Sequence, residues 1–173
     1  AYVSLTIFDK PAVENSQLTV CENESGAGIG TFNLSSLNNT VGGSNKVEWF
    51  SNVQRTAPIT NPAAYLSTSG NVYVVVTNET TGCSDTTFVT LIVNTKPNAG
   101  TDSTGVKAIC NDIATVNLPD AAAGESWAQL GSSPTVVTIN PTTGVVTGMD
   151  AIGTYRFVLT NSNTNCADTV NIE

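Results

Sequence analysis

The sequence contains no histidine and has few charged residues and few aromatic residues. Without histidine, the chain cannot form a Ser-His-Asp or Cys-His catalytic arrangement or a zinc site that uses histidine ligands. It carries 6 Lys or Arg residues against 14 Asp or Glu residues, which gives a formal net charge of −8. This charge argues against nucleic acid and anionic membrane surfaces as partners. No apolar run approaches the roughly 18 residues of a membrane span, so membrane insertion is not expected.

The residues that dominate the chain are Asn, Thr, Ser, Val and Gly, which suit strands and turns better than helices. Residues 71–78 and 154–161 are β-branched and aromatic runs that end at turn residues, as is typical of strands. Short strands separated regularly by turns predict an all-β sandwich. We therefore expect an all-β fold, with the immunoglobulin-like sandwich as its architecture.

The chain repeats itself. Residues 70–87 read "GNVYVVVTNETTGCSDTT" and residues 153–170 read "GTYRFVLTNSNTNCADTV", so Gly, Thr-Asn, Cys and Asp-Thr recur with no gap. Each copy is preceded by a tryptophan, in "VEWF" at residues 47–50 and in "ESWA" at residues 125–128. We expect a tryptophan and a tyrosine from each unit to lie in its core, namely Trp49, Tyr73, Trp127 and Tyr155.

The four cysteines are Cys21, Cys83, Cys110 and Cys166, and none of them forms a CxxC motif. Because the repeat gives each unit two cysteines, the economical pairings are Cys21–Cys83 and Cys110–Cys166. Each bond would close a loop of roughly 60 residues and stabilise its unit by about 4 kcal/mol. Disulfides would also place the protein outside the cytoplasm. The alternative is two buried free thiols in each domain.

These patterns predict two tandem domains. A polar linker, "NTKPNAGTDSTG" at residues 94–105, separates an immunoglobulin-like domain at 11–96 from a second one at 97–173, whose last strand is incomplete. Residues 1–10 are either the final strand of a preceding unit or the first strand of the first domain.

The phase of the repeat favours the first of these two alternatives. "VSLTIFDKP" at residues 3–11 matches "VTLIVNTKP" at residues 89–97, and residues 89–94 are expected to form the final strand of the first unit. Residues 3–8 should therefore lie outside the sheet of the unit that contains Cys21. Two explanations compete: a segment of a continuous filament, and head-to-tail polymerisation in which identical subunits donate this strand to one another.

Two stretches carry a resemblance to known families. "TVVTINPTTGVVTGMDAIGTYRF" at residues 135–157 resembles the bacterial immunoglobulin-like group 2 pattern, although residues 51–70 of the first unit lack its "GVVTG" element. The two-cysteine repeat resembles the tandem repeats of very large Bacteroidota surface proteins, of which the gliding-motility adhesins of the type IX secretion system are examples. The resemblance implies an extracellular, cell-surface protein.

The same resemblance implies O-glycosylation at Asp-Ser/Thr motifs, which would fall on Thr86, Ser103 and Thr169. Two of these motifs occupy the same place in each repeat, just after the second cysteine. The alternative is that Asp85 and Asp168 accept hydrogen bonds within a turn.

No cofactor is expected, and calcium is the metal for which the sequence offers candidate ligands. These are the carboxylates near the domain junctions, Glu22, Glu24, Asp102 and Asp112. The alternative is that they are solvated loop side chains, and the sequence has no Asp-x-Asp-x-Asp-Gly loop.

The resulting hypothesis is a non-enzymatic, extracellular structural or adhesive repeat segment of a bacterial surface filament or adhesin. Its expected partners are neighbouring repeats or identical subunits arranged head to tail, and a surface or glycan ligand that the sequence does not identify. Two alternatives are an accessory carbohydrate-binding module of a secreted enzyme and a pilin-like subunit that polymerises by strand donation.

Overall fold

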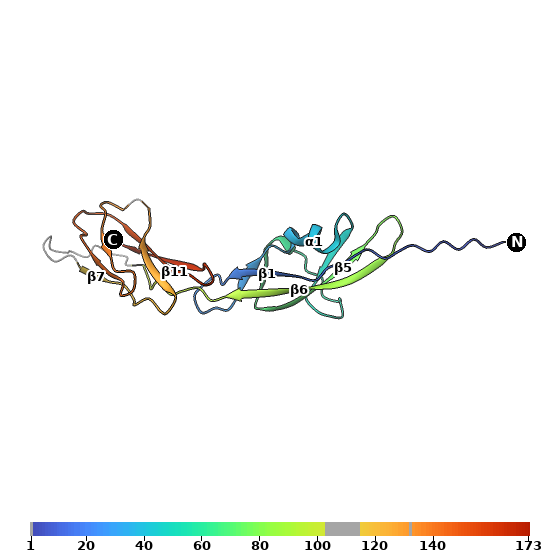
Figure 1. Ribbon diagram of the computed structural model, residues 1–173, viewed down its shortest axis with the longest axis horizontal. Helices are drawn as coiled ribbons and strands as arrows, with labels where there is room; N and C mark the ends of the chain where they lie inside the picture. The colour runs from blue at the N-terminus through green and yellow to red at the C-terminus, as the bar shows by residue number, and fades with distance from the viewer. Residues whose placement is uncertain (1, 103–114, 132) are drawn as a thin grey trace. The chain divides into compact units, whose positions relative to one another are not determined.

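The computed structural model describes residues 2–102, 115–131 and 133–173. The chain divides into two compact units, each of which is described by itself here (Figure 1). Unit 1 comprises the residues up to Asn23 together with Ala27–Asn94, and unit 2 comprises Glu24–Gly26 and Thr95–Glu173. Both units are built from short strands, in agreement with the predicted all-β class.

Unit 1 contains a four-stranded sheet in the order β1-β6-β5-β3 and a two-stranded sheet, β2-β4. Strand β1 pairs with β6 in parallel, whereas the other pairs are antiparallel. Its elements are β1 (Ser16–Cys21), β2 (Gly30–Phe32), η1 (Leu34–Leu37), α1 (Asn38–Gly42), β3 (Lys46–Phe50), η2 (Pro62–Ala64), β4 (Tyr65–Ser67), β5 (Gly70–Thr77) and β6 (Ser84–Asn94).

The core of unit 1 follows from the alternation of side chains along β5 and β6. Alternate valines of β5 are buried, and so are Val89 and Leu91 of β6, because successive side chains of a strand point to opposite faces. Trp49 of β3 packs into the same cluster with 4% of its surface exposed. Its indole Nε1 donates a hydrogen bond of 2.9 Å to the Asn38 side-chain oxygen, which satisfies the buried donor.

Tyr73 does not lie in this core, contrary to the sequence-based expectation. It is half-buried and alternates with the buried Val72 and Val74, so it points to the other face of the sheet. In the gapless repeat, Tyr155 corresponds to Val72 rather than to Tyr73. A one-residue offset between the two tyrosines therefore places them on opposite faces of equivalent strands.

Unit 2 contains two three-stranded antiparallel sheets, β7-β10-β9 and β12-β11-β8. Taken in chain order, strands 7, 10 and 9 match B, E and D of an immunoglobulin sandwich, and strands 12, 11 and 8 match G, F and C. The elements are β7 (Thr115–Asn117), β8 (Glu125–Gln129), β9 (Thr138–Ile139), β10 (Val145–Thr147), β11 (Tyr155–Asn161) and β12 (Ala167–Ile172).

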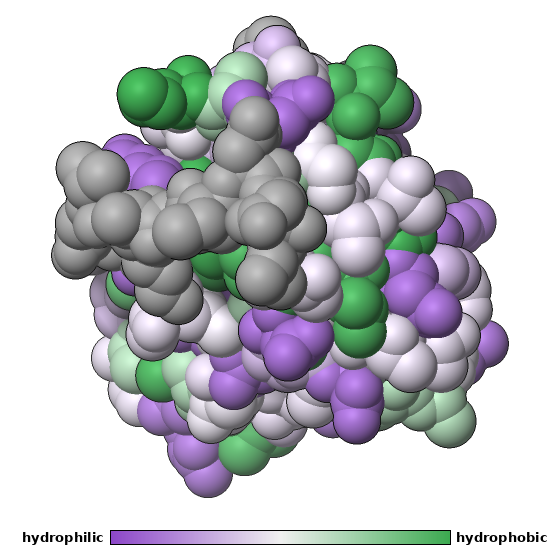
Figure 2. Space-filling model, turned by 90° about the vertical axis from the view of Figure 1, so that its left-hand side faces the viewer, coloured by the Kyte–Doolittle hydropathy of each residue, from purple (hydrophilic) through white to green (hydrophobic). Residues whose placement is uncertain are grey.

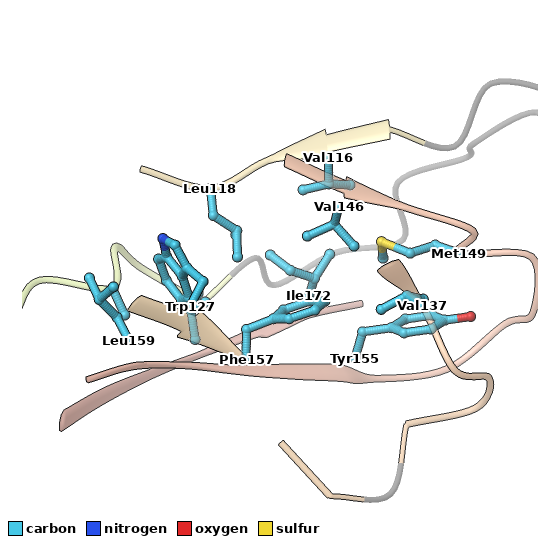
Figure 3. Packing of buried hydrophobic residues seen from close by; sticks show 12 residues of the cluster. Val116, Leu118, Trp127, Val137, Val146, Met149, Tyr155, Phe157, Leu159 and Ile172 are labelled. Carbon is cyan, nitrogen blue, oxygen red and sulfur yellow. The ribbon is translucent and has the colours of Figure 1, made fainter. Parts of the chain in front are cut away.

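The apolar side chains of the two sheets meet between them (Figure 3). Val116 and Val146 come from one sheet, and Trp127 and Phe157 come from the other. Trp127 is 3% exposed, and its Nε1 donates a hydrogen bond of 2.8 Å to the carbonyl oxygen of Pro119. Each unit thus has one tryptophan in its core.

Residues 3–8 form no strand within unit 1, as the phase of the repeat predicts. They run as an extended segment away from the strands of that unit (Figure 1). Val3, Leu5 and Ile7 are 94%, 83% and 84% exposed. That this segment completes the sheet of another domain stays a prediction.

Tyr155 ties the start of β11 to the preceding loop. Its hydroxyl donates to the carbonyl oxygen of Ala151 (2.9 Å) and accepts from the Ala151 amide (3.2 Å), while Thr135 Oγ1 lies 3.1 Å away. The residue is 2% exposed. A tyrosine at the start of strand F that bonds back to the backbone a few residues upstream is the tyrosine corner of Greek-key sandwiches.

Substitution of Tyr155 with Phe should lower the free energy of unfolding of unit 2 by about 1–3 kcal/mol, because both Ala151 backbone groups lose a buried partner. Urea unfolding can be followed by tryptophan fluorescence in a Trp49→Phe background, in which Trp127 reports unit 2. The matched control is Tyr73→Phe, measured on unit 1 in a Trp127→Phe background, for which little change is expected. Equal losses for the two substitutions would contradict the tyrosine corner.

Candidate functional site

A turn ending in a cysteine joins the last two strands of each unit; we call residues 78–83 and 161–166 the cysteine turns. In unit 1, the Asn78 amide donates to the Cys83 carbonyl (2.9 Å), and the Gly82 amide donates to the Asn78 carbonyl (2.8 Å). The Asn78 side-chain oxygen accepts from the amide of Thr80 (3.0 Å). An asparagine that bonds the backbone two residues further on is a standard way to start a turn.

The cysteine turn of unit 2 repeats this geometry. The Asn161 amide donates to the Cys166 carbonyl (2.8 Å), the Asn165 amide donates to the Asn161 carbonyl (2.8 Å), and the Asn161 side chain accepts from Asn163 (3.0 Å). The residue before each cysteine has positive φ, 72° at Gly82 and 57° at Asn165. Glycine and asparagine are the residues that adopt this conformation most readily.

The states of the cysteines differ from the predicted pairing. Cys21 and Cys166 are each disulfide-bonded, whereas Cys83 is a free thiol. Cys110, which the sequence pairs with Cys166, lies outside the described residues. The predicted Cys21–Cys83 bond is therefore wrong.

The physical reason is the parallel pairing of β1 with β6. Cys21 lies opposite Asn94 at the last residue of β6, whereas Cys83 precedes its first residue, Ser84. Eleven residues of strand, at about 3.3 Å each, separate the two cysteines by about 35 Å. A disulfide requires Cα atoms within roughly 4.4–6.8 Å of each other, so these two cysteines cannot bond.

Residues 3–8 and 89–94 correspond to each other in the repeat, and the last residue of each lies beside a cysteine. One of these cysteines is in β1, and the other ends a cysteine turn. Asn94 is the ladder partner of Cys21, and its carbonyl accepts a hydrogen bond of 2.9 Å from the amide of Glu22. Phe8 is the residue that corresponds to Asn94 in the repeat, and its carbonyl accepts from the Cys83 thiol at 3.8 Å. Asn94 at the end of β6 therefore lies beside a β1 cysteine, and Phe8, which corresponds to it in the repeat, lies beside a cysteine turn.

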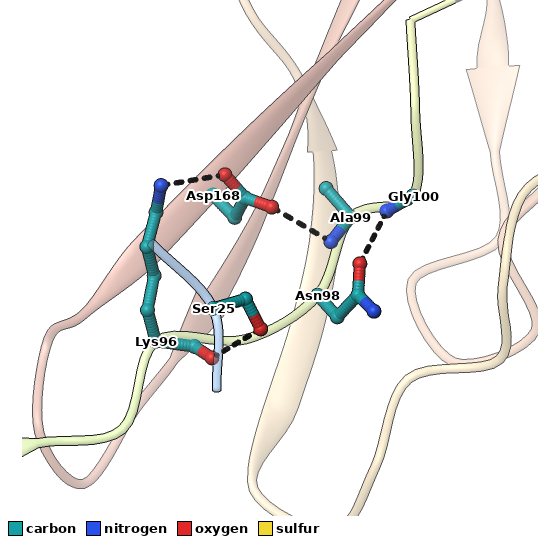
Figure 4. Close-up of polar contacts among 6 residues, drawn as sticks. All are labelled: Ser25, Lys96, Asn98, Ala99, Gly100 and Asp168. Carbon is teal, nitrogen blue, oxygen red and sulfur yellow. Dashed lines mark hydrogen bonds and ion pairs between the residues drawn. The ribbon is translucent and has the colours of Figure 1, made fainter. Parts of the chain in front are cut away.

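A lysine near the start of each unit forms an ion pair with the aspartate that follows the cysteine turn; we call this the linker clamp. In unit 2, Lys96 Nζ lies 2.8 Å from Asp168, whose second oxygen accepts from the Ala99 amide at 3.0 Å (Figure 4). The Lys96 and Asp168 side chains are only 21% and 17% exposed. The Lys96 carbonyl also accepts a hydrogen bond from the Ser25 hydroxyl (3.2 Å).

Unit 1 repeats the linker clamp in a looser form. Lys10 Nζ lies 3.7 Å from Asp85, and the side chains are 69% and 35% exposed. Pro11 and Pro97, which directly follow the two lysines, are both buried. The predicted linker therefore does not begin as a free segment: Asn94 ends β6 of unit 1, whereas Lys96 and Ala99 belong to unit 2, and Ala99 is part of its core cluster.

The clamp changes the titration of Asp168. Burial acts to raise the pKa of this carboxyl, but hydrogen bonds from Lys96 and from the Ala99 and Thr169 amides outweigh burial and hold the pKa below its ordinary value of 3.8. The pKa of Asp102 is also lowered, because its carboxylate accepts two hydrogen bonds of 2.8 Å from the backbone amide and side chain of Asn171.

The structure describes three of the four predicted calcium ligands. Glu22 is 3% exposed, and its carboxylate accepts from the Gly28 amide at 2.7 Å, whereas Glu24 is exposed. Asp102 binds Asn171, and Asp112 lies outside the described residues. In the part of the chain that the structure describes, no three His, Cys, Asp or Glu residues form a group that could hold a metal ion.

The predicted modification sites are accessible where the structure describes them. Thr86 and Thr169 are exposed, and Ser103 lies outside the described residues. The aspartates of the corresponding motifs, Asp85 and Asp168, belong to the linker clamps. Glycosylation at these positions stays a prediction.

The surface of unit 2 is mixed in polarity. On the face shown in Figure 2, hydrophobic atoms lie in separate patches among polar ones. Val136 and Ile152 are 92% and 102% exposed as single residues in loops. Isolated apolar side chains of this kind are normal on protein surfaces and do not indicate a binding site.

Residues 17–97 match the model of the Flavobacterium inter-domain disulphide bond domain. This match covers unit 1 from β1 to the lysine-proline pair and fits the Bacteroidota resemblance of the repeat. No curated protein matches the chain. None of the described helices is long and apolar enough to cross a membrane.

Several solved structures are similar to the chain at low identity. Drosophila OTK extracellular domains 3–5 match with 14% identity and a TM-score of 0.36, over 94% of this chain and 59% of that one. This chain thus spans less than two thirds of that relative. The titin tandem A164-A165 matches with 13% identity and a TM-score of 0.26, over 94% of this chain and 95% of that one.

Asp168→Asn should lower the free energy of unfolding of unit 2 at neutral pH by about 1–2 kcal/mol, because a charge-assisted contact is lost. A carboxyl whose pKa is lower in the folded state stabilises it above the ordinary pKa, and this stabilisation is lost as the pH falls through the folded-state value. The difference between parent and variant should therefore shrink below about pH 4. Urea titrations read by Trp127 fluorescence in the Trp49→Phe background measure it.

The control is Asp85→Asn in unit 1, measured through Trp49 in the Trp127→Phe background. Its ion pair is longer and more exposed, so a loss of less than about 1 kcal/mol is expected. A pH-independent difference for Asp168→Asn would show that the clamp does not stabilise unit 2 through the charge of Asp168.

Proposed function

We propose that this chain is a non-enzymatic structural or adhesive repeat segment of an extracellular bacterial surface protein, in which disulfides join consecutive domains instead of closing single ones. The observation that carries this proposal is the position of the cysteines along β1 and β6. Cys21 is bonded, yet the other cysteine of unit 1 lies about 35 Å away along the sheet.

The repeat supplies the partner for such a bond. Asn94 lies beside Cys21 at the end of its own unit, and the corresponding Phe8 lies beside the cysteine turn of the unit that follows it. If consecutive units share this geometry, the β1 cysteine of one unit and the turn cysteine of the next lie on either side of one segment. The matched domain model, whose description specifies an inter-domain disulphide bond, supports the same arrangement.

A disulfide across a domain boundary suits a structural role. Domains joined only by a linker move relative to each other by default. A second covalent connection restrains that motion and keeps neighbouring domains connected when the linker is strained. Such bonds persist in oxidising surroundings, which fits a protein that is secreted or displayed at the cell surface. Neighbouring repeats arranged head to tail are then the principal partners.

Peptide mapping tests the proposal. When the native chain is alkylated, unfolded and digested without reduction, the Cys21 peptide should be recovered joined to a peptide from residues 95–173, and Cys83 should carry the alkyl label. Cys83→Ser should leave the bond intact, whereas Cys21→Ser should expose one further thiol outside unit 1. A Cys21 peptide joined to the Cys83 peptide would overturn the proposal.

A further inference from the structure

We propose that Cys83 is a covalent attachment site for a neighbouring repeat. Its free thiol forms a disulfide bond with the β1 cysteine of the neighbouring repeat. Residues 3–8 of this chain serve as the final strand of that repeat. The inference rests on the inter-domain disulfide of the proposed function and adds the acceptor residue, the attaching strand and the direction of attachment.

The first observation is the state of the equivalent cysteine. Cys166 occupies the same place in the same hydrogen-bonded turn as Cys83, and Cys166 is disulfide-bonded. The two cysteine amides also make equivalent hydrogen bonds of 3.3 Å. The Cys83 amide donates to the Thr81 hydroxyl, and the Cys166 amide donates to the Thr164 hydroxyl. The cysteine turn is therefore a bonding position in unit 2, and the same position in unit 1 holds a free, half-buried thiol.

The second observation is the exposed apolar segment beside that thiol. Val3, Leu5 and Ile7 are almost fully exposed, whereas the corresponding Val89 and Leu91 of β6 are 0% and 1% exposed. Alternate apolar residues on a strand are typical of one that buries a single face against a core. The occupant that fits this segment is thus a unit built like unit 1, in which it takes the place of residues 89–94.

The last residue of this segment, Phe8, lies at the attachment site. The Phe8 carbonyl accepts from the Cys83 thiol, and Lys10 pairs with Asp85, two residues after Cys83. In unit 1, the residue paired with the last position of β6 is Cys21. A repeat that uses residues 3–8 in the same way places its own equivalent of Cys21 at Phe8, next to Cys83.

The bond forms by thiol–disulfide exchange with a low-molecular-weight disulfide such as oxidised glutathione. One cysteine thiolate attacks the disulfide, forming a mixed disulfide and releasing one glutathione thiolate. The second cysteine thiolate then attacks the protein sulfur of the mixed disulfide and releases the second glutathione thiolate. Both cysteine protons pass to solvent, the two cysteines are oxidised, and the glutathione disulfide is reduced to two thiols.

A three-unit chain tests this inference. Because residues 3–8 correspond to residues 89–94, residues 1–88 can be placed directly before residues 3–173 to add one copy of unit 1 in phase. In the added copy, Cys83 is changed to Ser so that the label reports only the following Cys83. After oxidation with glutathione disulfide, that Cys83 should resist alkylation, and its peptide should be joined to the Cys21 peptide of the added copy.

Two controls separate attachment from simple shielding. Cys21→Ser in the added copy should restore alkylation of the following Cys83. Leu5→Asp with Ile7→Asp at the junction should also restore it, because the strand could no longer bury its apolar face. In the original chain the same pair of substitutions should leave the unfolding of unit 1 unchanged, since both side chains are exposed there.

The outcomes distinguish the two proposals. If the following Cys83 stays alkylated while its own Cys21 remains joined to residues 95–173, the attachment site is wrong and the inter-domain disulfide stands. If Cys21 is joined to Cys83 of the same unit, both proposals fall. If protection survives Leu5→Asp with Ile7→Asp, the strand is not what positions the bond, and the attachment by residues 3–8 is overturned.

Discussion

The parallel pairing of β1 with the second half of β6 is the constraint on which the chemistry of this protein depends. It places Cys21 of β1 beside the last residue of β6, whereas the cysteine turn of unit 1 precedes the first residue of β6. No loop movement compatible with the sheet can bring two cysteines together across about 35 Å. Cys21 and Cys83 of unit 1 are therefore available only to partners outside that unit.

The linker clamp is a second feature that recurs in both units. The aspartate two residues after each turn cysteine pairs with the lysine near the start of the same unit, which fixes the entering chain near the cysteine turn. The tight, nearly buried pair at Lys96–Asp168 is supported by backbone amides, whereas Lys10–Asp85 is exposed. The recurrence of Asp-Thr after each cysteine thus has a structural role, independent of any modification of the threonines.

Unit 1 must be stable without a bond between Cys21 and Cys83. Unit 1 achieves this with a compact cluster of valine, leucine and phenylalanine side chains around Trp49. The core of unit 2 is a cluster around Trp127, to which the hydrogen bonds of Tyr155 are added. Apolar burial supplies the main driving force, and the satisfied indole and hydroxyl groups avoid the cost of buried unpaired donors. The core of unit 1 therefore stabilises this domain without a bond between its two cysteines.

By itself, the sequence determined the all-β class, the repeat and its phase, and the principal strands, because alternation and turn residues act over a few neighbouring positions. The course of residues 3–8 outside the sheet of unit 1 also followed from local similarity. Only the tertiary structure decided the fate of Cys21 and Cys83, because pairing depends on distance in space and β1 joins β6 from more than 60 residues away. It also decided that Tyr73 leaves the core while Tyr155 enters it, since a shift of one residue reverses the face of a strand.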